Sequence, residues 1–187
     1  MNIAKHEFLE NQIVSMTLMA TTQRGKVYHA DASDDGKTTF RHDIRFQLRR
    51  IADEYKTEVA EERHIANIEK LSDQISQTHS NILTQGRFRI GSAQKAINLY
   101  LKYLWCLEKI PTPPHCPFDA IVLGYVPNCK TVRWTQLDSL SEYREIVRLA
   151  KIAAEGKSLS EWELNLYNIY GVAQPGSPPD APQAARR

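Results

Sequence analysis

The chain has 187 residues, enough for one well-buried core, and this length allows a second small domain without requiring one. Its 42% apolar and 25% charged residues are those of an ordinary globular protein, and it lacks the run of about 18 to 20 apolar residues that a membrane helix needs. The net charge of +2 neither requires nor excludes a nucleic-acid partner. Acidic residues near the N-terminus argue against a secretory signal, so we expect a cytoplasmic protein.

Helical periodicity dominates the first half of the chain. Apolar residues recur at helical spacing in 6–19, 40–55 and 59–83, and we expect one helix in each range. Glycines and the acidic run DASDD predict a loop or short hairpin over 24–39. Arginines cluster on the second helix, where a solvated basic face is the simplest interpretation. They are Arg41, Arg45, Arg49 and Arg50.

A glycine-bracketed basic turn, GRFRIG, precedes the next helix. Gly86 and Gly91 enclose two arginines, and glycine lets a backbone turn tightly or approach a ligand closely. Ser92 is the expected N-cap of the following helix, whose first N–H groups would face a bound anion such as a phosphate. The turn is therefore a candidate phosphate-binding site, with Arg87 and Arg89 as its cations.

The fourth expected helix, 93–107, has an apolar side and a polar side. Lys95 and Lys102 are seven residues apart, close to two turns, so they share a face that lies outside the buried side together with Asn98. Four prolines then prevent continuation of the helix and predict a stiff, extended segment, the proline loop; they are Pro111, Pro113, Pro114 and Pro117. The loop leads to Asp119, which either caps a short helix or presents its carboxylate to a substrate.

Two further helices are expected at 139–154 and 160–170, each opened by a serine with a glutamate nearby. The C-terminal segment is rich in Pro and Ala and has no core-forming residues, so we expect it to be disordered. We predict a mainly α protein with a single helical domain, 1–173, and a disordered tail, 174–187. The three cysteines are expected to be reduced, since their spacing fits neither a disulfide framework nor a zinc site. They are Cys106, Cys116 and Cys129.

The order of helix, basic turn, helix and aspartate after a proline loop resembles the helix-hairpin-helix DNA glycosylase superfamily over about 65–149. In that family the backbone amides of a glycine-rich hairpin bind a DNA phosphate, the next helix can carry a catalytic lysine, and an aspartate follows the loop. Here GRFRIGSAQKA resembles a degenerate hairpin, Lys95 stands near the lysine position, and CPFDAIVL resembles the segment of the aspartate, Asp119. The whole sequence also resembles small bacterial anti-phage glycosylases that remove modified cytosines from phage DNA.

The resemblance implies a helix-hairpin-helix-like fold and double-stranded DNA as the partner, with phage DNA that carries modified bases as one form of it. We expect no cofactor, no metal, no membrane contact and no obligatory protein partner. The implied catalytic residues are Asp119 and Lys95. The implied DNA-binding residues are Arg87, Arg89, Gly91, Ser92 and Lys102, and the implied base pocket comprises Phe88, His115 and Trp134.

The expected chemistry is hydrolysis of the N-glycosidic bond of a modified base. Bond cleavage builds positive charge on the sugar, and an ionised carboxylate at Asp119 would stabilise that charge. Lys95 fits an assisting or phosphate-contacting cation better than a nucleophile, because a nucleophilic lysine requires a depressed pKa. An enzyme that acts on a base also needs a plane to receive the flipped nucleotide, which an aromatic side chain can provide.

Two alternatives stay open. The first is an all-α RNase, because Arg24 and His29 match the R-x4-H pattern of dimeric enzymes of that kind. The second is a non-enzymatic DNA-binding module, in which the basic turn grips phosphate and Asp119 is only a helix cap.

Overall fold

Helices and their connections make up the computed structural model, which describes residues 3–170 apart from the side chains of residues 3, 6, 24 and 170. The prediction of a mainly α protein is confirmed, and the expected tail at 174–187 lies outside the described residues. Within the described part no helix is long and apolar enough to cross a membrane. The elements are α1 (Ile3–Gly25), α2 (Asp34–Ala52), η1 (Asp53–Lys56), α3 (Glu61–His79), η2 (Thr84–Gly86), α4 (Ile90–Cys106), α5 (Ala120–Tyr125), η3 (Trp134–Gln136), α6 (Leu140–Ala153) and α7 (Leu159–Tyr170), where η denotes a 3-10 helix.

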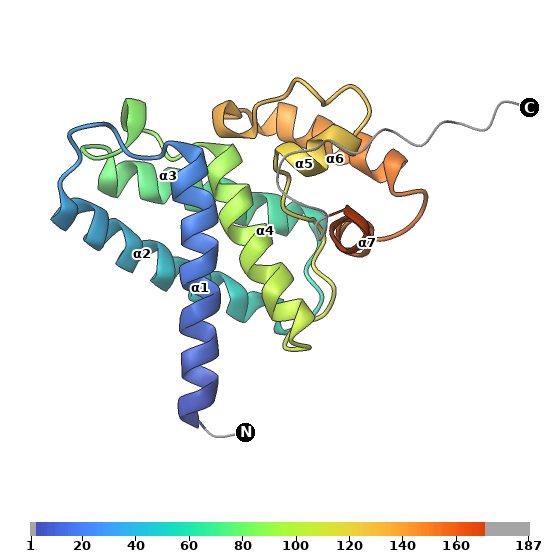
Figure 1. Cartoon of the computed structure of the whole chain (residues 1–187), viewed down its shortest axis with the longest axis horizontal. Helices are drawn as coiled ribbons and strands as arrows, with labels where there is room; N and C mark the ends of the chain where they lie inside the picture. The colour runs from blue at the N-terminus through green and yellow to red at the C-terminus, as the bar shows by residue number, and fades with distance from the viewer. Residues whose placement is uncertain (1–2, 171–187) are drawn as a thin grey trace, which may run out of the picture.

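Helix α4 lies at the centre of the molecule, as Figure 1 shows. It packs against α1, α2, α3, α6 and η3. Because neighbours surround its first half, every side chain from residue 90 to residue 98 is buried. The predicted division into one apolar and one polar side is therefore wrong for this half. Lys95 and Asn98, which were expected outside the buried side, are 6% and 0% exposed.

The first connection is shorter than the sequence predicted. Helix α1 continues to Gly25 and α2 begins at Asp34, so the loop expected over 24–39 covers only 26–33. The cause is a helix cap: the Ser33 hydroxyl accepts a hydrogen bond from the Gly36 N–H at 3.1 Å. Two aspartates in the first turn of α2 add favourable charge at the positive end of the helix dipole.

Helix α4 begins before the predicted N-cap. Its first residue is Ile90, with Arg89 at the N-cap position, so the assignment of Ser92 as N-cap is wrong. The first N–H groups find their partners in the segment before α6 instead of on a serine. By contrast, α6 begins where predicted, and its cap Ser139 accepts from the Glu142 N–H at 3.3 Å.

Candidate active site

Asp119 and Lys95 meet where α4 passes the start of α5. Lys95 Nζ lies 2.8 Å from Asp119 Oδ2, and the two side chains are 8% and 21% exposed. The other carboxylate oxygen, Oδ1, accepts from the N–H groups of Ile121 at 3.0 Å and Val122 at 3.1 Å. Asp119 therefore caps α5 and binds the lysine at the same time, and the cap role foreseen for it is confirmed.

The surroundings of Asp119 keep its carboxylate ionised. Burial by itself raises the pKa of Asp119. The charge and hydrogen bond of Lys95, together with the N–H groups of Val122 and Ile121, outweigh burial and hold the pKa below the ordinary value of 3.8. The site thus presents a fixed negative charge that is partly open to solvent.

Polar side chains of α4 hold the proline loop that carries Asp119. Gln94 bonds to the peptide of Phe118 in both directions: its Nε2 donates to the Phe118 carbonyl at 2.8 Å and its Oε1 accepts from the Phe118 N–H at 3.1 Å. Asn98 Nδ2 donates to the Cys116 carbonyl at 2.9 Å. These bonds explain why Gln94 and Asn98 are buried, and they fix the backbone immediately before Asp119.

His115 belongs to the same loop and anchors it to α6 and α3. Its ring is fully buried, and Nδ1 lies 2.8 Å from the hydroxyl of Tyr143 on α6. The ring also packs edge to face on His64 of α3, with 4.6 Å between ring centroids. In this structure His115 is thus a packing residue of the core, although the sequence placed it in a base pocket.

The two arginines of the basic turn are bound within the protein. Arg87 Nη1 donates to Asp73 at 2.7 Å, and Arg87 Nε lies 3.2 Å from both carboxylate oxygens of Asp138. Arg89 Nη1 donates to the Thr135 carbonyl at 3.0 Å. Neither guanidinium is free in this structure for the phosphate contacts that the sequence predicted.

Backbone amides at the start of α4 are also satisfied internally. The Ile90 N–H donates to Asp138 Oδ1 at 3.1 Å, and the Gly91 N–H donates to the Leu137 carbonyl at 2.8 Å. Ser92 is only 3% exposed. A carboxylate of the protein therefore occupies the position at which we expected a phosphate.

Two further predicted pocket residues lie in the core. Phe88 is fully buried and packs edge to face on Phe40, with 5.7 Å between ring centroids. Trp134 is 5% exposed, and its carbonyl group packs so closely on Gly91 that it leaves no room for a Cβ atom there. The structure thus brings Lys95 and Asp119 together, but it places Phe88 and Trp134 where no ligand reaches them in this conformation.

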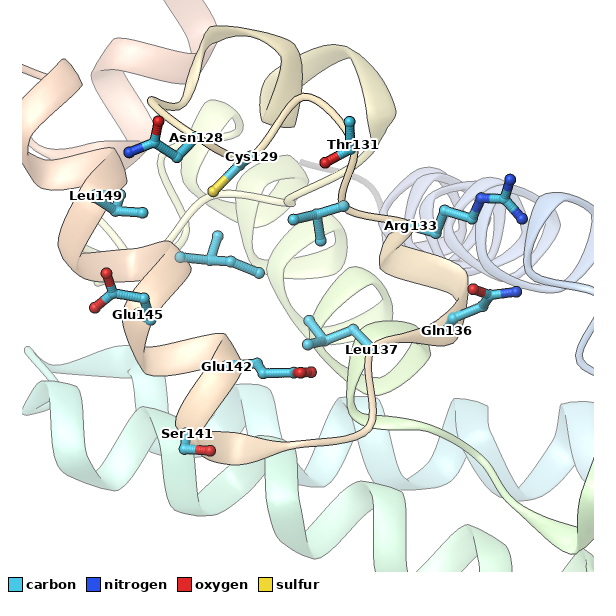
Figure 2. Close-up of a pocket in the computed structure, with 12 residues that line it drawn as sticks. Asn128, Cys129, Thr131, Arg133, Gln136, Leu137, Ser141, Glu142, Glu145 and Leu149 are labelled. Carbon is cyan, nitrogen blue, oxygen red and sulfur yellow. The ribbon is translucent and has the colours of Figure 1, made fainter.

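Figure 2 shows a cavity between the segment 128–137 and α6, with a volume of about 830 Å³. Its lining includes the apolar side chains of Ile146 and Leu149, whereas neither Lys95 nor Asp119 lines it. Arg133 stands at the rim and points away from the cavity in the same view.

Two residues around the candidate site were not singled out from the sequence. Arg133 is exposed, its side chain has no polar partner among residues 3–170, and it precedes η3, which packs against α4. Glu163 of α7 forms an ion pair with Lys102, which the sequence had assigned to DNA. An isolated arginine and a helical glutamate have no distinguishing signal in the sequence.

His29, the histidine of the R-x4-H pattern, fastens the loop after α1. Its Nε2 donates to the Asn81 carbonyl at 2.6 Å, and its Nδ1 accepts from the Asp31 N–H at 3.1 Å. Both ring nitrogens are therefore engaged, and the Arg24 side chain lies outside what the structure describes.

Comparison with models of protein families, with curated proteins and with solved structures found no match. Among residues 3–170 no group of three or more His, Cys, Asp or Glu side chains is placed to hold a metal ion. The geometry of the site is therefore the basis for assigning its chemistry, above all the ion pair of Lys95 and Asp119.

Proposed function

We propose that the chain is a DNA N-glycosylase in which Asp119 stabilises the cleavage of the bond between a modified base and its sugar. The observation that carries the proposal is the ion pair of Lys95 and Asp119, because it holds one partly exposed carboxylate ionised and immobile. A buried ion pair contributes little to stability compared with apolar packing, so its presence favours a functional role.

The chemistry follows from where charge develops. As the glycosidic bond breaks, C1′ and the ring oxygen of the sugar become positive, and a fixed carboxylate lowers the free energy of that state. The same carboxylate can orient a water molecule for attack on C1′. Since Asp119 is already held by three donors, it needs no rearrangement when the charge appears.

Lys95 acts in this proposal as the cation that fixes Asp119. Its Nζ donates to the carboxylate at 2.8 Å, and in this proposal it does so as the ammonium partner of an ion pair. An ammonium group has no lone pair with which to attack C1′. We therefore infer hydrolysis by water, without a covalent bond between Lys95 and the sugar.

Duplex DNA is the proposed partner, and modified cytosine in phage DNA, removed as a defence against phage, is the first substrate to test. Arg133 is the best candidate for a phosphate contact, because its side chain is exposed and has no polar partner among the described residues. Lys26, also exposed, follows the end of α1, where Gly25 lies close to Ser92 and Trp134. Both cations lie near the first turn of α4.

A non-enzymatic DNA-binding module is the second candidate function. The observation in its favour is that Asp119 caps α5, which gives this aspartate a structural role that needs no substrate. The two proposals differ in whether loss of the negative charge matters, since the cap requires only an oxygen acceptor.

The test is base release from DNA by the wild type and by Asp119→Asn. Asparagine is as good an N-cap as aspartate, so the variant keeps the acceptor for α5 and loses the charge. We expect mass spectrometry to detect a released base and an abasic site with wild-type protein on DNA containing modified cytosine. Asp119→Asn should release base at least about 100-fold more slowly and bind the same DNA with similar affinity.

Two outcomes contradict the proposal. One is base release by Asp119→Asn at the wild-type rate. The other is the absence of release from ordinary and cytosine-modified DNA when the wild type binds both, which would favour the non-enzymatic module.

A further inference from the structure

A row of arginines follows the outward side of α2. Arg41, Arg45 and Arg49 succeed one another at intervals of four residues, so they span about 12 Å along one side of the helix. Arg50 and Phe46 are both exposed and lie beside this row. These four arginines and Phe46 form the arginine face of α2.

Neutral side chains of α1 orient two of these arginines. Arg45 Nη2 donates to the Ser15 hydroxyl at 2.8 Å, and Arg49 Nη2 donates to Asn11 Oδ1 at 2.8 Å. A hydroxyl or amide oxygen fixes the direction of a guanidinium group but leaves its positive charge uncompensated. Because a guanidinium group has five N–H donors, most of them stay available to a second acceptor.

The arginine face also lacks ion pairs. Within residues 3–170 no carboxylate forms an ion pair with any of its four guanidinium groups, and Arg50 donates instead to Gln47 Oε1 at 2.9 Å. The arginines of α3 and α6, by contrast, bind glutamates. The pairs are Arg63 with Glu54, Arg144 with Glu62 and Arg148 with Glu145.

Acidic residues close to the arginine face in the sequence bind other groups. Each has a histidine or lysine within ion-pair distance, so none is left to neutralise an arginine of α2. The pairs are Asp43 with His79 at 2.8 Å, Asp53 with Lys56 at 2.7 Å and Glu10 with Lys109 at 3.1 Å. Positive charge is therefore concentrated on this side of α2, which favours an anionic partner.

Phe46 lies within the arginine face and is 61% exposed. It precedes Arg49 by three residues and Arg50 by four, and side chains at these spacings are neighbours on a helix. A single exposed apolar side chain is ordinary. An aromatic ring among uncompensated guanidinium groups, however, combines the two features that hold single-stranded nucleic acid, cations for the phosphates and a ring on which a base stacks.

We propose that the arginine face binds a single strand of nucleic acid, with phosphates on the guanidinium groups and a base stacked on Phe46. A planar guanidinium group can pair with one phosphate through two parallel hydrogen bonds. Orientation by Ser15 and Asn11 suits a strand with discrete phosphates, whereas the diffuse charge of a membrane surface does not require it. A duplex, whose bases are already stacked, leaves Phe46 without a partner.

This inference goes beyond the proposed glycosylase function and does not depend on it. In Figure 1 α2 lies apart from α5, so the arginine face is separate from the pair of Lys95 and Asp119. Binding of a strand to α2 needs neither that pair nor release of a base.

The first experiment measures binding of an oligothymidine of about 16 nucleotides by fluorescence anisotropy at several salt concentrations. Arg45→Gln/Arg49→Gln should weaken binding at least about 10-fold and reduce the slope of log affinity against log salt by about 1.4, since each phosphate contact contributes about 0.7 for a single strand. The matched control is Arg144→Gln/Arg148→Gln, which removes the same charge from exposed ion pairs of α6. The control should bind within about twofold of the wild type.

Asn11→Asp tests the arginine face without removing an arginine. Aspartate keeps the oxygen acceptor for Arg49 and adds a negative charge, so the new ion pair should compete with phosphate. We expect severalfold weaker binding of the oligothymidine, with a melting temperature that is unchanged or higher. Binding equal to that of the wild type would contradict the proposal.

Phe46→Ala separates base stacking from charge. We expect affinity for the oligothymidine to fall at least about 5-fold and affinity for a duplex of the same length to stay unchanged. Ile152→Ala is the matched control, because Ile152 on α6 is 58% exposed and should make no contact with the strand. A Phe46→Ala variant that binds the oligothymidine as the wild type does overturns the proposal.

Two further outcomes also overturn it. One is wild-type protein that does not bind the oligothymidine at low salt, and the other is an equal loss of affinity in the α6 control. Vesicles of phosphatidylcholine and phosphatidylserine test the remaining partner: if the α2 variants lose vesicle binding and keep strand binding, the arginine face binds anionic lipid instead. Asp119→Asn should bind the oligothymidine as the wild type does, so failure of base release leaves the result at α2 standing.

Discussion

The hydrogen bonds to Asp119 have two separate effects. The two N–H groups of α5 fix where the carboxylate lies, and they would bind an asparagine in the same way. Lys95 fixes the charge, because a buried cation favours the ionised form of its partner. Substitution of Asp119 by Asn therefore separates the effect of the charge from that of the position.

Two arginines near the start of α4 allow DNA affinity and fold stability to be tested separately. Arg133→Ala removes an exposed cation with no polar partner in the described part of the chain, so we expect DNA affinity to fall severalfold with the melting temperature unchanged. Arg87→Ala, the matched control, leaves Asp73 and Asp138 without their cation and should cost about 1 to 2 kcal/mol of stability. Thermal melts and fluorescence anisotropy with a DNA duplex measure the two effects. An unchanged DNA affinity in Arg133→Ala would remove this residue from the interface.

At this scale the environment of a polar residue is what the sequence failed to predict. It singled out Lys95 and Asp119 as site residues, but it placed Lys95 and Asn98 outside the buried side. Helical periodicity treats a polar residue as outward-facing unless a partner is known. Here the partners, Asp119 and the Cys116 carbonyl, come from a later loop whose path the sequence leaves open.

At the scale of elements, close contact between α4 and η3 determines what the basic turn can do. A Cβ atom added at Gly91 would lie 1.7 Å from the Trp134 carbonyl oxygen, so only glycine fits while η3 keeps its place. The sequence identified Gly91 as special for its backbone and assigned the close approach to a phosphate. In the structure the approaching group is η3, and the difference arises because nothing local in GRFRIG shows that a distant segment returns to it.

Two glycine substitutions test this packing. We expect Gly91→Ala to destabilise the protein by at least about 2 kcal/mol, because either η3 or α4 must shift. Gly124→Ala is the matched control: nothing lies within 4 Å of its added Cβ, and alanine favours the helical conformation of α5, so stability should rise by about 0.5 to 1 kcal/mol. Urea unfolding of both variants provides the comparison. Equal midpoints for Gly91→Ala and wild type would mean that η3 is not held against α4 as described.

At the scale of the whole molecule, a buried polar network ties distant elements to the candidate active site. The hydroxyl of Tyr55 lies 2.7 Å from His64 Nδ1, and His64 packs on His115, whose Nδ1 meets the Tyr143 hydroxyl. Asn98 Nδ2 lies 3.3 Å from that same hydroxyl. The network thus connects α3, the proline loop, α6 and α4, and it holds the loop that carries Asp119.

Global stability should consequently depend on pH through His64 and His115. Both rings are fully buried, and burial lowers the pKa of each below 6.5, that of His64 strongly. The unfolded chain therefore binds more protons than the folded one as pH falls below about 6.5, and stability is lost in that direction. Above about 6.5 both states carry neutral rings, and these two residues contribute no further change.

The loss should approach about 2.7 kcal/mol per pH unit while both rings stay neutral in the folded state and charged in the unfolded state. Urea unfolding at pH 8, 7, 6 and 5 measures it, and the double variant His64→Gln/His115→Gln is the control. The variant should be less stable at pH 8 but should show a flatter decline toward pH 5, because glutamine does not titrate. If wild type and variant decline in parallel, other groups cause the acid sensitivity, and the network holds the proline loop without making it sensitive to pH.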